Sequence, residues 1–235
     1  MAATASHVPA SIASSGAAAR SVVTGATMTE TSTFRPPPIH AFPPFYTIQH
    51  NPVSRAQQLS QWRALILDYC RHHRIFTLSP LPGSSDSSVT KGDASDPHAA
   101  LFSNRSIQRS LSPESIRQVL ADLVDHKQAA WEEQLTSAAK SKTNSNSNLN
   151  AKAYIYWKTP IQWADSIYEW VMQTGQNKSI MTLFELNEGE LVQSRDFYQL
   201  PTPMLRQALK HLSTQGKAQI FAGTEADDGE GVKFV

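Results

Sequence analysis

A weak internal repeat constrains this chain of 235 residues more than any other feature of its sequence. The offset is 89 residues, measured from Ile116 to Leu205. The residues that it aligns are Ile116, Arg117, Gln118, Leu120, Leu123 and Ala129 on Leu205, Arg206, Gln207, Leu209, Leu212 and Ala218. Shorter matches are Gln61-Trp62 on Gln162-Trp163 and Thr77-Leu78 on Thr182-Leu183. A repeat of this kind predicts two similar small domains in tandem rather than one large domain.

In the first half, helical periodicity alternates with short β-branched and aromatic runs. Helices are predicted at 57–73, more weakly at 99–108, and from Pro113 onward, with Ser112 as the N-cap. The predicted strands are 75–79, 129–133 and 153–158. The apolar positions spaced three and four apart are Leu59, Trp62, Ile66, Tyr69, Cys70 and His73 on the first helix, and Ile116, Val119, Leu120, Leu123 and Val124 on the third.

The second half repeats this order of elements. Thr159 and Pro160 start a helix that Gly175 stops, and Thr202 and Pro203 start another that Gly216 stops. The other predicted elements are a strand at 179–183, a helical turn at 184–187, and two strands, 219–222 and 231–235, that flank an acidic turn at Asp227, Asp228 and Gly229. Helix, strand, helix, helix and hairpin make a winged helix. The predicted fold is therefore mostly α with small β-hairpins (α+β), as two tandem winged-helix domains.

Three segments carry too few large apolar groups to join a core. They are the Ala/Ser/Thr-rich N-terminus and the polar tracts 80–97 and 136–150. We interpret the N-terminus as a disordered extension rather than a transit peptide, because Arg20 is the only arginine before Arg35, and Met28 is an alternative start. The predicted organisation is a disordered extension at 1–40, a first domain at 41–158 and a second at 159–235.

Catalytic and metal-binding patterns are missing from the sequence. Its eight histidines form no zinc-binding helix pair, and no nucleophile elbow or phosphate-binding loop occurs. The single cysteine, Cys70, lies on a predicted apolar stripe, excludes an internal disulfide and fits a reducing compartment. We expect no enzyme activity, no catalytic residues, no cofactor and no metal. No apolar run approaches the roughly 20 residues that span a bilayer, and the cytosol is the default location.

Winged helices commonly bind DNA, so DNA binding or a transcription-associated role is the alternative hypothesis. The helix after Ser112 carries Glu114, Asp122 and Asp125 against Arg117, which disfavours phosphate contact. The helix after Thr202 is more basic, with Arg206, Lys210 and His211. The hairpin that follows it is acidic, with Glu225, Asp227, Asp228 and Glu230. The charges therefore favour a protein partner over DNA.

Segment 42–46, Phe42-Pro43-Pro44-Phe45-Tyr46, is the most distinctive short stretch. Its prolines favour an extended polyproline II backbone that would present Phe45 and Tyr46 to an apolar pocket of a partner. Two other interpretations stay open. The Pro-Pro-x-Tyr pattern also matches ligands of WW domains, and the aromatic rings could pack against this chain's own first domain.

Several blocks in the same order make the chain resemble the family of the smallest subunit of the ESCRT-II complex. The blocks are FPPFYTIQ from Phe42, QQLSQWRALILDYCR from Gln57, YWKTPIQWADSIYEWV from Tyr156, TGQNKSIMTLFEL from Thr174 and GVKFV from Gly231. The resemblance covers about residues 42–235. It departs from the compact family pattern in the N-terminal extension and in the tracts 80–97 and 136–150.

This resemblance implies two winged-helix domains and a non-catalytic adaptor that sorts ubiquitinated membrane cargo into multivesicular bodies. It implies that Phe42, Pro43, Pro44, Phe45 and Tyr46 bind the two larger ESCRT-II subunits, with two copies of this chain per complex. The second domain would recruit the initiating ESCRT-III subunit, with Arg206 and Lys210 as candidate contacts. The chain would be cytoplasmic, recruited peripherally to the endosome through its partners, without binding nucleic acid.

Overall fold

The computed structural model describes residues 34–81, 97–136, 151–221 and 230–235. The predicted N-terminal extension up to residue 33, most of the two polar tracts and the acidic turn at 225–228 lie outside these residues. Residues 34–235 belong to one compact unit.

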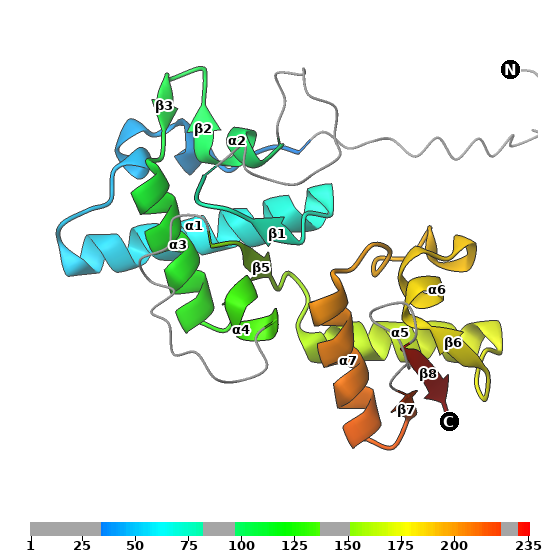
Figure 1. Cartoon of the computed structure of the whole chain (residues 1–235). Helices are drawn as coiled ribbons and strands as arrows, with labels where there is room; N and C mark the ends of the chain where they lie inside the picture. The colour runs from blue at the N-terminus through cyan, green and yellow to red at the C-terminus, as the bar shows by residue number, and fades with distance from the viewer. Residues whose placement is uncertain (1–33, 82–96, 137–150, 222–229) are drawn as a thin grey trace, which may run out of the picture. The chain divides into compact units, whose positions relative to one another are not determined.

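Among the described residues, the N-terminal half contains two short 3-10 turns, four helices and five short strands (Figure 1). In chain order the elements are η1 (Pro38–Ala41), η2 (Pro43–Tyr46), α1 (Pro52–His73), β1 (Thr77–Leu78), α2 (Pro97–Phe102), β2 (Ser103–Asn104), β3 (Arg109–Ser110), α3 (Pro113–Asp125), β4 (Ala129–Trp131), α4 (Glu132–Thr136) and β5 (Ala153–Ile155).

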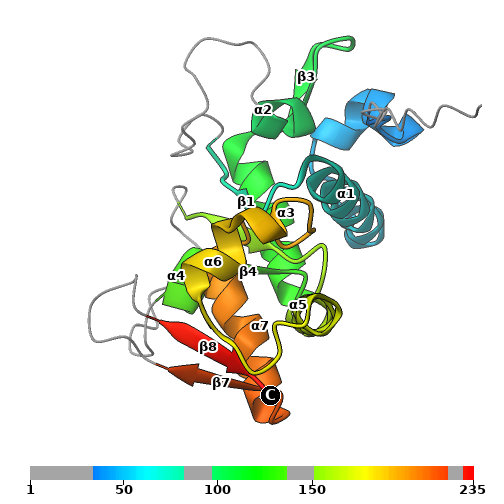
Figure 2. The same ribbon diagram turned by 90° about the vertical axis from the view of Figure 1, so that its right-hand side faces the viewer.

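The C-terminal half has a similar succession. Its elements are α5 (Pro160–Thr174), β6 (Ile180–Thr182), α6 (Leu183–Glu188), η4 (Glu190–Val192), α7 (Thr202–Thr214), β7 (Ala218–Phe221) and β8 (Gly231–Phe234). The strands β7 and β8 run side by side as the hairpin of this half (Figure 2).

The two halves share one sheet topology. The first sheet has the strand order β1-β5-β4 and the second β6-β8-β7, both antiparallel. In each sheet the last strand, β5 or β8, lies in the middle. On one side it pairs with the strand that follows the first helix of that half, β1 or β6. On the other side it pairs with the strand that follows α3 or α7, which is β4 or β7. Helices α3 and α7 begin 89 residues apart and end 89 residues apart, as the repeat requires. The α+β fold class with winged-helix topology is confirmed, while the domain division at 158/159 stays a prediction.

Local capping explains where the helices begin and end. Ser112 accepts a hydrogen bond from the Ser115 amide at the start of α3, and Thr159 forms a capping box with Gln162 at the start of α5. Gly175 ends α5 with a φ of 68°, in the left-handed region that glycine tolerates. One expected cap is wrong. Helix α7 has Pro201 as its N-cap, without a side-chain cap bond, and Thr202 is its first residue.

Two predicted helices differ from the structure, the first of them in two respects. Helix α1 begins at Pro52 rather than residue 57, because Asn51 caps it and accepts hydrogen bonds from the amides of Val53 and Ser54. Residues 103–110 form the hairpin β2–β3 instead of continuing a helix. Of the predicted apolar stripe of α1, Leu59 is only half-buried and His73 is exposed.

The core contains the two tryptophans that the repeat aligns. Trp62 of α1 and Trp163 of α5 are both completely buried, as predicted. Trp157, just before α5, is also buried and lies edge-on to Trp163 with ring centroids 4.7 Å apart. Phe76 stacks on Trp157 at 5.5 Å, so the rings of Phe76, Trp157 and Trp163 form one aromatic cluster. No helix in the described residues is long and apolar enough to cross a membrane.

Candidate partner-binding site

Segment 42–46 is folded, not extended. The predicted polyproline II conformation is wrong, because Pro43–Tyr46 forms the 3-10 turn η2, directly after η1. The Phe45 amide donates to the Phe42 carbonyl at 3.0 Å, and the Thr47 amide donates to the Pro44 carbonyl at 3.2 Å. Proline at the first position of each turn has the φ that such a turn needs and lacks only an amide that the turn leaves free.

Phe45 and Tyr46 pack into this chain's own core. The Phe45 ring stacks on Trp62 with centroids 4.2 Å apart, and the Tyr46 ring meets Trp62 edge-on at 5.8 Å. Their exposed fractions are 2% and 5%. The interpretation that these two rings pack against their own domain is confirmed, while a direct contact of either ring with a partner stays a prediction. The physical reason is the Trp62 indole, which offers a flat apolar surface beside the turn.

Buried polar groups fix this turn to α1. Gln58 donates from Nε2 to the carbonyls of Phe45 and Thr47, both at 2.9 Å, and Trp62 donates from Nε1 to the Phe45 carbonyl at 3.2 Å. The Tyr46 hydroxyl donates to the His40 carbonyl at 3.0 Å. Burial raises the pKa of Tyr46 to about 12. These bonds satisfy the carbonyls that a tight turn leaves unpaired.

The outer side of the turn carries the rest of segment 42–46. Pro43 and Pro44 are exposed, and Phe42 has an exposed fraction of 53%. A shallow groove runs between this side and α1. Its lining residues are Ile39, Phe42, Pro44, Phe45, Gln49, Ser54, Gln57, Gln58 and Gln61. The site thus combines an exposed phenyl ring and prolines with a wall of uncharged amides.

A histidine that sequence reasoning missed supports the turn from behind. The buried His40 lies 3.4 Å from the Leu101 carbonyl through Nε2 and 3.3 Å from the Asn104 side-chain amide through Nδ1. Asn104 also donates to the His40 carbonyl at 2.8 Å. Burial lowers the pKa of His40. Because Asn104 lies 64 positions further along the chain, no local sequence pattern predicts this contact.

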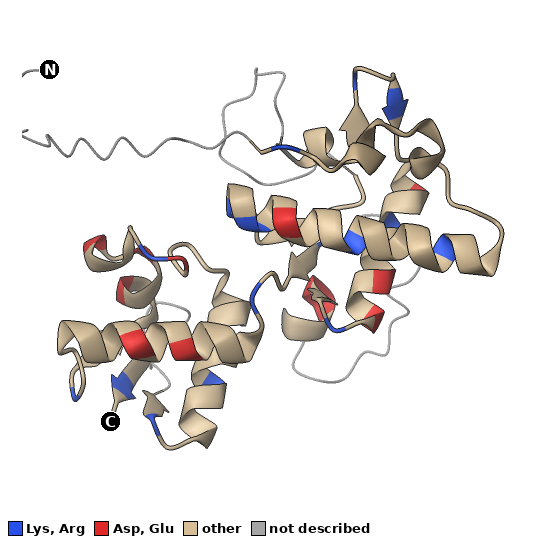
Figure 3. Cartoon of the chain, turned by 180° about the vertical axis from the view of Figure 1, so that it is seen from behind, with Lys and Arg blue, Asp and Glu red and all other residues tan. Residues whose placement is uncertain are grey.

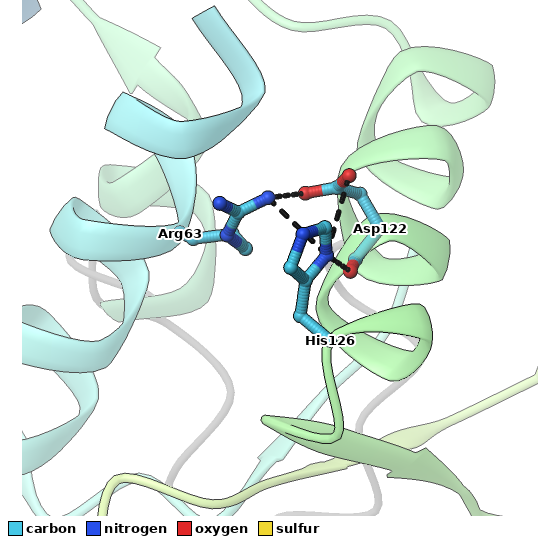
Figure 4. A network of polar contacts seen from close by, with 3 residues as sticks. All are labelled: Arg63, Asp122 and His126. Atoms are coloured by element: carbon cyan, nitrogen blue, oxygen red, sulfur yellow. Dashed lines mark hydrogen bonds and ion pairs between the residues drawn. The ribbon is translucent and has the colours of Figure 1, made fainter. Parts of the chain in front are cut away.

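Arg63, Asp122 and His126 form the polar network in Figure 4, which joins α1 to α3. Arg63 donates to the Asp122 carboxylate, and His126 lies 2.8 Å from the Asp122 main-chain carbonyl. The network connects two packed helices, α1 and α3, through an ion pair and a hydrogen bond. Cys70 is completely buried, and burial raises the pKa of its thiol, which makes it an inert core residue. The described residues contain no cluster of three metal-ligating side chains.

The two candidate ESCRT-III contacts both lie exposed on α7. Arg206 donates at 2.8 Å to Glu230, the residue before β8, while Lys210 lies about one helical turn further along α7. Figure 3 marks acidic positions along the ribbon of α3, the equivalent helix of the first half. Among the described residues, no contact links Arg206 or Lys210 to segment 42–46.

Comparison with known proteins gives a consistent result. The family model described as "ESCRT-II complex subunit" matches residues 39–201. Vacuolar protein-sorting-associated protein 25 of Homo sapiens is 35% identical over 83% of this chain and 94% of its own length. The protein of the same name from Dictyostelium discoideum is 34% identical over 86% of this chain and 96% of its own length.

Solved structures agree with the sequence relatives. The crystal structure of subunit VPS25 of the endosomal trafficking complex ESCRT-II has a TM-score of 0.65 and 31% identity, over 85% of this chain and 98% of that one. A chain in the crystal structure of endosomal complex ESCRT-II (VPS22/VPS25/VPS36) has a TM-score of 0.65 and 27% identity, over the same shares of both chains.

Proposed function

Since this chain belongs to the family of ESCRT-II complex subunits, we propose that it is the adaptor that links the larger subunits of that complex to ESCRT-III. The family is one of structural subunits and not of enzymes. The adaptor would serve the sorting of ubiquitinated membrane cargo into multivesicular bodies. It would be present in two copies per complex and be recruited from the cytoplasm to the endosome through its partners.

The N-terminal contact rests on the exposed side of segment 42–46. The observation that carries it is Phe42, a large apolar side chain left more than half exposed on a turn that is otherwise tightly fixed. Phe42, Pro43 and Pro44 would touch the larger subunits, which correspond to VPS22 and VPS36 in the related solved complex. Phe45 and Tyr46 would contribute indirectly, by holding the turn in place.

The C-terminal contact is the less defined part of the proposal. It assigns the recruitment of the initiating ESCRT-III subunit to the half that begins at Thr159, with Arg206 and Lys210 as the candidate residues. Both are on the outward side of α7 and accessible to a partner.

Replacing Phe42 tests the N-terminal contact. An aromatic anchor in a partner's pocket typically costs about 2 kcal/mol or more on truncation, so Phe42→Ala should weaken binding to the larger subunits more than tenfold. The measurement is a titration of the intact chain against the purified pair of larger subunits. The folded state should be unaffected, because the ring has few contacts to lose.

Ile161→Ala is the matched control, since Ile161 of α5 is 52% exposed and lies in the other half of the chain. It should leave the affinity for the larger subunits unchanged. Equal affinities for Phe42→Ala and the unaltered chain would contradict the assignment of segment 42–46 as the docking element.

A further inference from the structure

The direction of the exposed Phe42 side chain is set by the residues on either side of it. Its phenyl ring is more than half exposed, so the ring itself has little contact with the domain. The next two residues, Pro43 and Pro44, have no amide hydrogen to donate. The orientation of the ring therefore depends on how the two ends of the surrounding stretch, residues 40–47, are held. We call this stretch the docking turn.

The two ends of the docking turn meet at one carbonyl group, that of His40. Its oxygen accepts a hydrogen bond from the Tyr46 hydroxyl at 3.0 Å and another from the side-chain amide of Asn104 at 2.8 Å. These two donors occupy both lone pairs of the oxygen. Asn104 belongs to the hairpin β2–β3, which lies beside η2 (Figure 1). The His40 carbonyl thus connects the two ends of the docking turn with each other and with the hairpin.

The hairpin holds the Asn104 side chain in one orientation. Its Oδ1 accepts hydrogen bonds from the Ser106 amide at 3.0 Å and from the Ser106 hydroxyl at 2.6 Å. Because the main-chain amide of Ser106 can only donate, the oxygen of Asn104 has to face it, and the nitrogen faces His40. Asn104 is therefore a donor that its own hairpin fixes and directs at the docking turn.

We propose that Asn104 is a positioning residue for the docking of the larger subunits. By donating to the His40 carbonyl it holds the docking turn in the arrangement that presents Phe42, without touching the partner itself. The inference rests on the proposed function, since Phe42 is the contact that Asn104 would act through. Only the fraction of molecules with the turn in this arrangement binds, so a loosened turn lowers the apparent affinity in proportion.

Asn104→Asp removes the donor and little else. Aspartate has the size of asparagine, and one of its carboxylate oxygens can keep the two bonds from Ser106. The other oxygen takes the place of the donor and repels the His40 carbonyl. Binding to the purified pair of larger subunits should weaken about tenfold, because the docking turn is then held at one end only. The titration uses the intact chain at about pH 8, where a histidine ring is neutral.

Gln108→Glu is the matched control. It makes the same change from amide to carboxylate, at an exposed position of the loop of the same hairpin. It should leave the affinity for the larger subunits unchanged. A loss as large as that of Asn104→Asp would show that the added negative charge, and not the lost donor, weakens binding, and would overturn the proposal.

The free chain gives a spectroscopic signature of the turn. The amides of Phe45 and Thr47 donate to the carbonyls of Phe42 and Pro44, so their hydrogen exchange measures the opening of the docking turn. In Asn104→Asp both amides should exchange about tenfold faster or more, while amides in the middle of α1 keep their rates. Unchanged exchange at Phe45 and Thr47, or equal acceleration throughout α1, would overturn the positioning role.

A double-mutant cycle separates positioning from a general loss of stability. If Asn104 acts through Phe42, the variant with both Phe42→Ala and Asn104→Asp should bind no more weakly than Phe42→Ala alone. Losses of affinity that multiply in the double variant would show that the two residues act independently, which contradicts the proposal.

The single variants distinguish the failure of this inference from the failure of the proposed function. If Phe42→Ala weakens binding and Asn104→Asp does not, the positioning role is overturned while the proposed docking contact stands. If Phe42→Ala binds as well as the unaltered chain, the proposed docking contact fails, and the positioning role fails with it.

Discussion

Phe42 and Phe45 lie three positions apart, yet the first is half exposed and the second is stacked on Trp62. The position of Phe42 outside the 3-10 turn causes this contrast, because two residues three apart within such a turn would lie on one side of it. The Phe42 backbone is extended, with φ of −95° and ψ of 112°. Phe42 thus exposes apolar surface that a partner can contact, and Phe45 holds the turn against the domain.

Phe45→Ala should therefore destabilise the chain by about 3–5 kcal/mol, the usual cost of removing a buried phenyl ring. Chemical denaturation of the intact chain measures the free energy of unfolding. Phe42→Ala is the control and should change it by less than about 0.5 kcal/mol. A Phe45→Ala variant as stable as the unaltered chain, but defective in complex assembly, would restore the view that this ring inserts in a partner.

At the scale of elements, the His40 side chain helps to join η1 to the β2–β3 hairpin. Its contacts fit the neutral ring, with Nε2 donating to Leu101 and Nδ1 accepting from Asn104. A protonated ring has no acceptor to offer Asn104. The joint between these two elements therefore depends on the charge state of His40.

The pH dependence of stability follows from the lowered pKa of His40. The unfolded chain, with a histidine pKa of about 6.5, binds a proton more readily than the folded one. The free energy of unfolding is therefore greatest above that value and should fall as pH drops below it. The pKa of His73 is also lowered, by partial desolvation of its ring and by the neighbouring His72, and this acts in the same direction.

Denaturation at pH 7.5 and at pH 5.5 measures this effect. The decrease between the two should be smaller in His40→Gln than in the unaltered chain, because the variant has no ring to protonate. His50→Gln is the control, since His50 is exposed. The same decrease in His40→Gln as in the unaltered chain would show that His40 does not contribute.

Sequence reasoning located the elements whose signals are local. Ser112, Thr159 and Gly175 mark helix ends by their own side chains or by a left-handed backbone, so their positions were predicted correctly. The β2–β3 hairpin was missed because its strands are two residues each and show no alternation, with Gln108 rather than glycine at a positive φ of 51°. The burial of Phe45 depends on its stacking against Trp62, 17 positions further along the chain. No pattern within segment 42–46 indicates that contact.

At the scale of the whole molecule, the charge distribution decides between a protein partner and DNA. Helix α3 exposes Glu114 and Asp125, and the Arg206 of α7 is already bonded to Glu230. On these two helices few Lys or Arg side chains remain to neutralise DNA phosphates, and each missing phosphate contact lowers the affinity for DNA.

We expect titrations of the intact chain with duplex DNA at physiological salt to show only nonspecific binding that disappears steeply as salt is raised. Duplexes of different sequence should bind equally. Sub-micromolar binding that selects one sequence would favour the DNA-binding alternative over the adaptor.

The 3-10 turn at Pro43–Tyr46, held by Gln58 and Trp62, has a consequence for the speed of assembly. A docking element that is already folded needs no ordering step after the first encounter, so the lifetime of the complex rather than its rate of formation would distinguish strong from weak variants. Association should proceed at the rate usual for two rigid surfaces, about 10⁵–10⁷ M⁻¹s⁻¹, and Phe42 would act by slowing dissociation.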